Sequence, residues 1–75
     1  MIFEKLKQII VDQLAIGPNE IELDSDIVDD FNADSLDIVE MLMKVESEWD
    51  IEVEDEEIEE LRTVQDIVNL IESKL

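Results

Sequence analysis

The serine in Asp34-Ser35-Leu36 stands where a loop gives way to the longest amphipathic stretch of the chain, so its hydroxyl is the first candidate for chemistry. A serine nucleophile needs a base to activate it, and this chain has no histidine and no G-x-S-x-G motif around Ser35. Hydrolase chemistry is therefore poorly supported. What remains for Ser35 is a helix cap or a site of modification, and composition alone favours the cap.

The two roles can also be divided between neighbouring residues. Asp34 could serve as the N-cap with Asp37 in the first turn, which would make Ser35 the first helical residue. A phosphoryl group on the Ser35 hydroxyl would then lie at the positive end of the helix dipole. The residues themselves leave both interpretations open.

The acidic segment before Ser35 begins like a calcium-binding loop but does not continue as one. Counted from Asp24, the fifth position is Val28, the sixth is Asp29 instead of glycine, and the twelfth is Ser35 instead of a bidentate glutamate. Cysteine and histidine, the usual ligands of zinc, are absent from the chain. We expect no metal site, and we expect the numerous carboxylates to form a solvated surface.

Charge restricts the class of partner. Twenty-three acidic residues against five basic ones give the 75-residue chain a formal net charge of −18, which disfavours nucleic acid and membrane surfaces and favours basic proteins. Disorder is the alternative, but 45% of the residues are apolar and they recur at helical spacing. No apolar run is long enough to span a bilayer. We expect one folded domain, residues 1–75, acting as a cytoplasmic monomer.

The first half of the chain predicts one helix and a long loop. Apolar residues recur on one helical face at Phe3, Leu6, Ile10 and Leu14. Gly17-Pro18 is expected to end this helix. From residue 19 to residue 34 no period is sustained, and we expect an ordered loop held by apolar anchors at Ile21, Leu23, Ile27, Val28 and Phe31.

The second half predicts three more helices. Residues 35–50 form the longest, residues 56–61 a short one, and the last begins at an N-cap, Thr63, with Asp66 completing a capping box, and runs to about Lys74. Ile51-Glu52-Val53 alternates like a strand, but a single strand has no sheet to join. The predicted fold is all-α, a four-helix bundle with a short third helix and a long loop between its first two helices.

The helix predicted over residues 35–50 carries two apolar stripes. The broad stripe suits a core face and consists of Ile38, Met41, Leu42, Val45 and Trp49. The other lies about 140° around the helix and consists of Leu36, Val39 and Met43, with Asp37, Glu40, Glu46, Ser47 and Asp50 around it. If the first stripe is buried, the second faces outward with an acidic rim, which suits docking to a basic surface. The alternative is a central helix buried on both sides.

Residues 31–40, Phe-Asn-Ala-Asp-Ser-Leu-Asp-Ile-Val-Glu, resemble the signature of the acyl carrier proteins. The likeness covers essentially the whole chain. Several further features occur in the family's order and spacing: a first helix, a long acidic loop, Glu48-Trp49-Asp50-Ile51 at the end of the amphipathic helix, Asp55-Glu56-Glu57, and Thr63-Val64 followed by Asp66.

The resemblance implies that Ser35 is esterified by 4′-phosphopantetheine, transferred from coenzyme A by a holo-acyl-carrier-protein synthase, within a motif that includes Asp34 and Leu36. Growing acyl chains would be carried as thioesters in fatty acid biosynthesis, and the protein would not be an enzyme. The resemblance also implies that fatty acid synthesis enzymes dock through basic patches onto Leu36, Asp37, Val39, Glu40, Met43 and Ser47.

Four positions depart from the family's pattern. Asn32 stands where glycine is usual, Glu54 where proline is common, Lys44 where a small apolar residue is frequent, and Ser47 where an acid is frequent. Asparagine tolerates left-handed backbone, so the first change is mild. Two alternatives stay open: a carrier for a specialised cargo, such as a polyketide or amino-acyl group, and an unmodified acidic interaction module in which Ser35 is only a cap.

Overall fold

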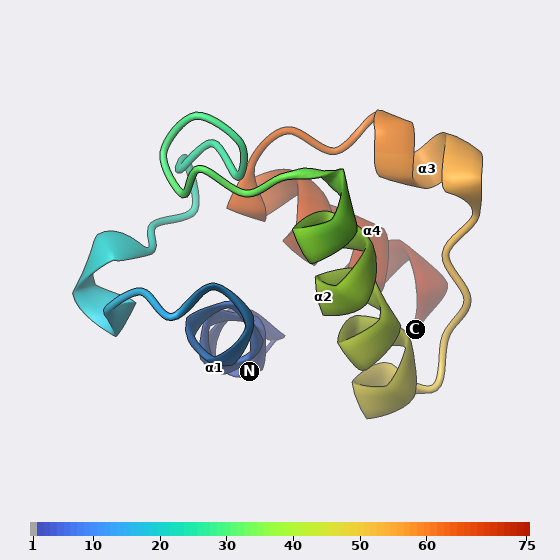
Figure 1. Ribbon diagram of the computed structural model, residues 1–75. Coiled ribbons are helices and arrows are strands. Elements are labelled where there is room, and N and C mark those ends of the chain that lie inside the picture. Colours follow the sequence, from blue (N-terminus) through green and yellow to red (C-terminus); the bar gives the residue numbers. More distant parts are fainter. Residues whose placement is uncertain (1) are drawn as a thin grey trace.

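Helices make up the regular structure of residues 2–75, the part of the chain that the computed structural model describes (Figure 1). They are α1 (Ile2–Leu14), the 3-10 helix η1 (Pro18–Glu20), α2 (Ser35–Trp49), α3 (Asp55–Glu59) and α4 (Val64–Lys74). The predicted all-α fold with a short third helix is confirmed. Among residues 2–75, no helix has the length and apolar character needed to cross a membrane.

The core lies where α1 packs against both α2 and α4. Figure 1 shows α1 nearly end-on beside α2, with α4 behind α2. The broad stripe of α2 faces this core as predicted, because Met41, Leu42 and Val45 are buried and Ile38 and Trp49 pack partly buried against them. The buried cluster consists of Leu6, Ile10, Ile21, Ile27, Phe31, Met41, Leu42, Val45, Val64, Ile67, Val68 and Ile71.

Helix α1 ends at Leu14, before the Gly17-Pro18 pair that was expected to end it, and the sequence gives no signal for this earlier end. Ala15 adopts a left-handed conformation with φ of 55°, and its N–H donates to the carbonyl of Val11 at 2.9 Å. A left-handed alanine is unfavourable by about 1–2 kcal/mol, so alanine does not normally indicate a helix end. Gly17 and Pro18 instead begin η1, where the Gly17 N–H donates to the Glu20 carboxylate at 3.0 Å.

The long loop between α1 and α2 is held by fewer apolar anchors than predicted. Ile21, Ile27 and Phe31 are buried, as expected. Leu23 and Val28 are exposed, so the prediction that they anchor the loop was wrong. Leu23 holds the loop through its backbone instead, because its carbonyl accepts a hydrogen bond from the N–H of Gln65 at 2.8 Å.

The same loop is fastened to the start of α4. Besides the Leu23 contact, Ile27 N–H donates to the Arg62 carbonyl at 2.9 Å and Val64 N–H donates to the Ser25 carbonyl at 3.1 Å. These bonds surround an isolated antiparallel bridge between Asp26 and Thr63. Since α4 is packed into the core, the loop that leads to α2 is fixed relative to the whole bundle.

Asp26 organises the tip of this loop. Its carboxylate accepts hydrogen bonds from the backbone N–H groups of Asp29 and Val28, both at 2.8 Å, and lies 3.8 Å from the guanidinium of Arg62. These hydrogen bonds, with a smaller contribution from Arg62, hold the pKa of Asp26 below its ordinary value. An ionised Asp26 therefore stabilises the loop.

The cap predicted for the last helix is confirmed. Thr63 is the N-cap of α4, its hydroxyl accepts from the Asp66 N–H at 3.2 Å, and the Asp66 carboxylate accepts from the Thr63 N–H at 3.1 Å. The N–H groups of Thr63 and Arg62 hold the pKa of Asp66 below its ordinary value. Val64, Ile67, Val68 and Ile71 form the inward face of α4, because all four are buried.

Helix α3 is the least embedded of the α-helices in residues 2–75. It begins one residue before the predicted start, and none of its residues is buried. Ile58 packs partly buried against the core. Residues 51–54 form no strand. Glu54 is the N-cap of α3, and its N–H donates to the Glu57 carboxylate at 3.0 Å, a bond that the proline common at this position in the family pattern could not make.

Candidate functional site

Ser35 is the first residue of α2, and its side chain is exposed. The capping role belongs to Asp34, as predicted: its carboxylate accepts from the Asp37 N–H at 2.9 Å, and the Asp37 carboxylate accepts from the Asp34 N–H at 3.4 Å. Within residues 2–75 the Ser35 hydroxyl has no hydrogen-bond partner. The cap therefore leaves the serine hydroxyl available to solvent.

The segment before Ser35 is held firmly. Phe31 and Ala33 are buried, while Asn32 between them is exposed and left-handed, with φ of 54°. Asparagine is one of the few residues other than glycine that visit this conformation readily, which explains why it can stand where glycine is usual. The two buried neighbours fix the chain on either side of this bend, so Ser35 is presented from a fixed position.

The position of Ser35 suits a hydroxyl that accepts a phosphoryl group. The N-terminal end of a helix carries partial positive charge, which stabilises a phosphate ester on the first helical residue. Histidine and cysteine are absent from the chain. Asp34, the nearest carboxylate in the sequence, is engaged as the cap. Ser35 thus has the accessibility and the electrostatic setting for a phosphoester.

The outward apolar stripe of α2 is confirmed. Leu36, Val39 and Met43 have 66%, 40% and 61% of their surface exposed, respectively. The alternative in which both stripes are buried is therefore excluded. These three apolar side chains face solvent on the helix that begins with Ser35 instead of packing into the core, as residues of an interaction surface do.

Some of the acidic residues around this stripe already accept hydrogen bonds within the protein. Glu46 accepts a hydrogen bond from the Val53 N–H at 2.8 Å, so it holds the connection between α2 and α3. Glu40 accepts from the side-chain amide of Gln13 on α1 at 3.4 Å. The sequence gives no signal for this contact, since it depends on how α1 is rotated against α2. Ser47 is exposed, and Asp50 ends α2 in a left-handed conformation.

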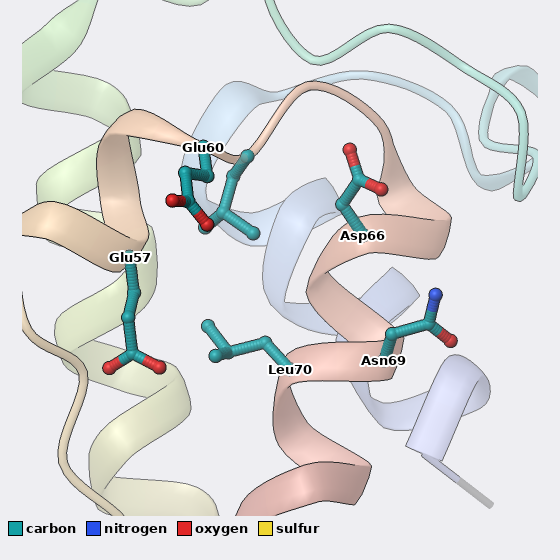
Figure 2. Close-up of a pocket in the computed structure, with 6 residues that line it drawn as sticks. Glu57, Glu60, Asp66, Asn69 and Leu70 are labelled. Atoms are coloured by element: carbon teal, nitrogen blue, oxygen red, sulfur yellow. The ribbon is translucent and has the colours of Figure 1, made fainter.

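A recess between α3 and α4 is lined by several acidic residues (Figure 2). It measures about 260 Å³ and is lined by Glu57, Glu60, Leu61, Asp66, Asn69 and Leu70. Two of its three carboxylates, those of Glu57 and Asp66, already have partners. Glu57 accepts from the Glu54 N–H at 3.0 Å and from Lys74 at 3.0 Å, and these bonds hold its pKa below the ordinary value. Asp66 belongs to the α4 cap.

These contacts give two of the acids structural roles, because Glu57 joins α3 to Lys74 on α4 and Asp66 caps α4. Across residues 2–75 no three Asp or Glu side chains come together as metal ligands. Ser35 and the outward stripe of α2 are therefore the stronger candidates for a functional site.

The comparisons with known proteins point to one family. A family model described as "Phosphopantetheine attachment site" matches residues 4–71. The acyl carrier protein of Clostridium acetobutylicum is 53% identical over 73 residues, which cover 97% of this chain and 95% of the relative. Those of Petrotoga mobilis and Bdellovibrio bacteriovorus are each 47% identical, over 99% and 97% of this chain and 87% and 94% of the relatives.

Proposed function

Because the chain belongs to the acyl carrier protein family, with 4′-phosphopantetheine from coenzyme A as its covalent cofactor, we propose that it carries growing acyl chains as thioesters in fatty acid biosynthesis. In this proposal Ser35 bears the cofactor. The observation that carries it lies at the start of α2, where Asp34 makes the cap and the exposed Ser35 hydroxyl has no hydrogen-bond partner among residues 2–75.

The loading step needs a second protein. The Ser35 oxygen attacks the phosphorus of coenzyme A that bears pantetheine, the pyrophosphate bond breaks, and a phosphodiester to serine forms while the nucleotide leaves. A holo-acyl-carrier-protein synthase would supply the base, since Asp34 is occupied by the Asp37 N–H. The N-terminal end of α2 would stabilise the new phosphodiester. When bound, the cofactor contributes a thiol that forms thioesters, and the chain itself catalyses nothing.

We further propose that partner enzymes read the exposed face of α2 beside Ser35. This docking face consists of Leu36, Asp37, Val39, Glu40, Met43 and Ser47. Its support is the exposure of the three apolar residues, the carboxylates beside them and the net charge of −18, which together suit a partner with a basic patch and an apolar centre. The partners would be the synthase that loads Ser35 and the enzymes of fatty acid synthesis.

The test of the loading site is intact mass spectrometry after incubation with coenzyme A and a promiscuous phosphopantetheinyl transferase. We expect a mass gain of one phosphopantetheine group, absent from Ser35→Ala and retained in Ser73→Ala, a control that removes an exposed serine hydroxyl on α4, outside the docking face. If the wild-type chain gained nothing, it would be an unmodified acidic interaction module, in which the start of α2 is only a capped helix.

A further inference from the structure

Lys44 differs from the other cations of this acidic chain. Four of the five basic side chains have a partner within the molecule: Lys5 with Glu48 at 3.4 Å, Arg62 with Asp26 at 3.8 Å, Lys74 with Glu57 at 3.0 Å, and Lys7 over the ring of Phe3 at 5.0 Å. Lys44 is exposed on α2 and has no such partner among residues 2–75. It is also the one basic residue of α2.

The carboxylates that could neutralise Lys44 on its own helix have other partners. Residues four positions apart on a helix are neighbours, so Glu40 and Glu48 are the natural candidates. Glu40 accepts from the Gln13 amide at 3.4 Å, and Glu48 pairs with Lys5 at 3.4 Å. Both contacts come from α1, which draws the two carboxylates away from the lysine. The packing of α1 on α2 therefore leaves the Lys44 ammonium group without a partner in the described part of the chain, residues 2–75.

The position of Lys44 places this charge at the edge of the docking face. By helical geometry it lies about 6 Å along the axis from Glu40 and about 40° around it. It also lies nearly in line with Asp37, about two turns further along the helix. One edge of the docking face thus changes from negative at Asp37 and Glu40 to positive at Lys44, and Ser47 beyond it is neutral.

We propose that Lys44 makes the docking face selective for partners of mixed charge, and this proposal rests on the proposed function. Such a partner places arginine or lysine opposite Asp37 and Glu40 and a carboxylate opposite Lys44, about one helical turn further along α2. With a net charge of −18 the protein attracts any basic surface, so acidity alone selects poorly. A uniformly basic partner would oppose Lys44 with a like charge, and such repulsion discriminates between partners.

The experiment measures KM for the holo protein with each acyl-transfer enzyme of the source organism that accepts it. The variants are Lys44→Ala and Lys44→Glu, and the control is Lys7→Glu, which makes the same charge change on α1, outside the docking face. For at least one enzyme we expect Lys44→Glu to raise KM about tenfold with kcat unchanged, and Lys7→Glu to stay within about twofold. High salt should reduce the difference, because exposed charges are screened.

A charge swap completes the test. Replacing the facing carboxylate of the responsive enzyme with lysine should restore its KM for the Lys44→Glu variant. If Lys44→Glu left KM unchanged or lowered it with every accepting enzyme, the docking face would read negative charge only and the selectivity proposal would be wrong. A chain that no transferase modifies at Ser35, or whose holo form no enzyme accepts, would instead overturn the proposed function.

Discussion

Met41 and Met43 provide a matched pair for separating the core of α2 from its docking face. They are the same residue type, two positions apart on one helix, yet Met41 has 1% of its surface exposed and Met43 61%. Truncating a buried methionine to alanine removes apolar contacts and leaves a cavity, at about 2–5 kcal/mol of unfolding free energy. The same truncation at an exposed site is expected to change stability by less than about 0.5 kcal/mol.

Urea denaturation and thermal unfolding of both variants measure this difference. For a domain of this size, a loss of about 2 kcal/mol lowers Tm by roughly 8–16 °C, so Met41→Ala should shift the transition strongly and Met43→Ala should hardly shift it. A small domain has only a few kcal/mol of net stability, and Met41→Ala could unfold it at low salt. Measurement in high salt, which screens the repulsion among the carboxylates, keeps the comparison quantitative.

The second assay follows modification of Ser35 by the phosphopantetheinyl transferase. Met43→Ala should raise KM about five- to tenfold while stability is retained, as expected for an apolar residue near the centre of an interface. Val39→Ala should behave in the same way, because it lies on the same exposed stripe. Equal losses of stability in the Met41 and Met43 variants, or an unchanged KM for Met43→Ala in a folded protein, would refute this division of α2.

Three further predictions concern single contacts. The folded-state pKa of Asp66 is lowered, so its ionised form stabilises the protein above about pH 4, and this contribution is lost as pH falls through the folded pKa. Urea denaturation should therefore show Asp66→Asn to be less stable than wild type near neutral pH, with a difference that shrinks in acid. Equal stability of the two proteins at pH 7 would contradict the capping role of Asp66. Asn32→Val should lose about 1–2 kcal/mol in the same assay because of the left-handed backbone, whereas Asn32→Gly should be close to neutral, and equal losses in the two would contradict the conformational reason. Lys74→Gln removes the ion pair to Glu57, so amide exchange in α3 should become a few-fold faster while exchange in α1 is unchanged; uniform acceleration would mean that α3 does not open independently.

Local signals made most of this fold predictable from sequence. The Thr63 and Asp66 pair satisfies two backbone donors within one turn, so a capping box can be read without the rest of the structure. The two stripes of α2 are predictable for the same reason, because helical geometry alone separates Met41 from Met43. Asp34 and Ser35 divide the cap and the free hydroxyl as their order in the chain suggested.

Features that depend on packing between distant segments were not predictable. Leu23 and Val28 look like core residues by composition, but the bonds that fasten the loop to α4 leave them exposed. The contact of Gln13 with Glu40 depends on the rotation of α1 against α2, which no local pattern specifies. Left-handed Ala15 has no sequence signal either, since alanine disfavours this conformation.

Localising the modification by tandem mass spectrometry tests the central claim most directly. The chain has four serines, at positions 25, 35, 47 and 73. Ser25 is buried, and Ser47 and Ser73 lie in the last turns of α2 and α4, at the negative ends of the helix dipoles. The account predicts one phosphopantetheine group, on the peptide that contains Ser35. A group found on any other serine, or a chain that accepts none, would contradict it.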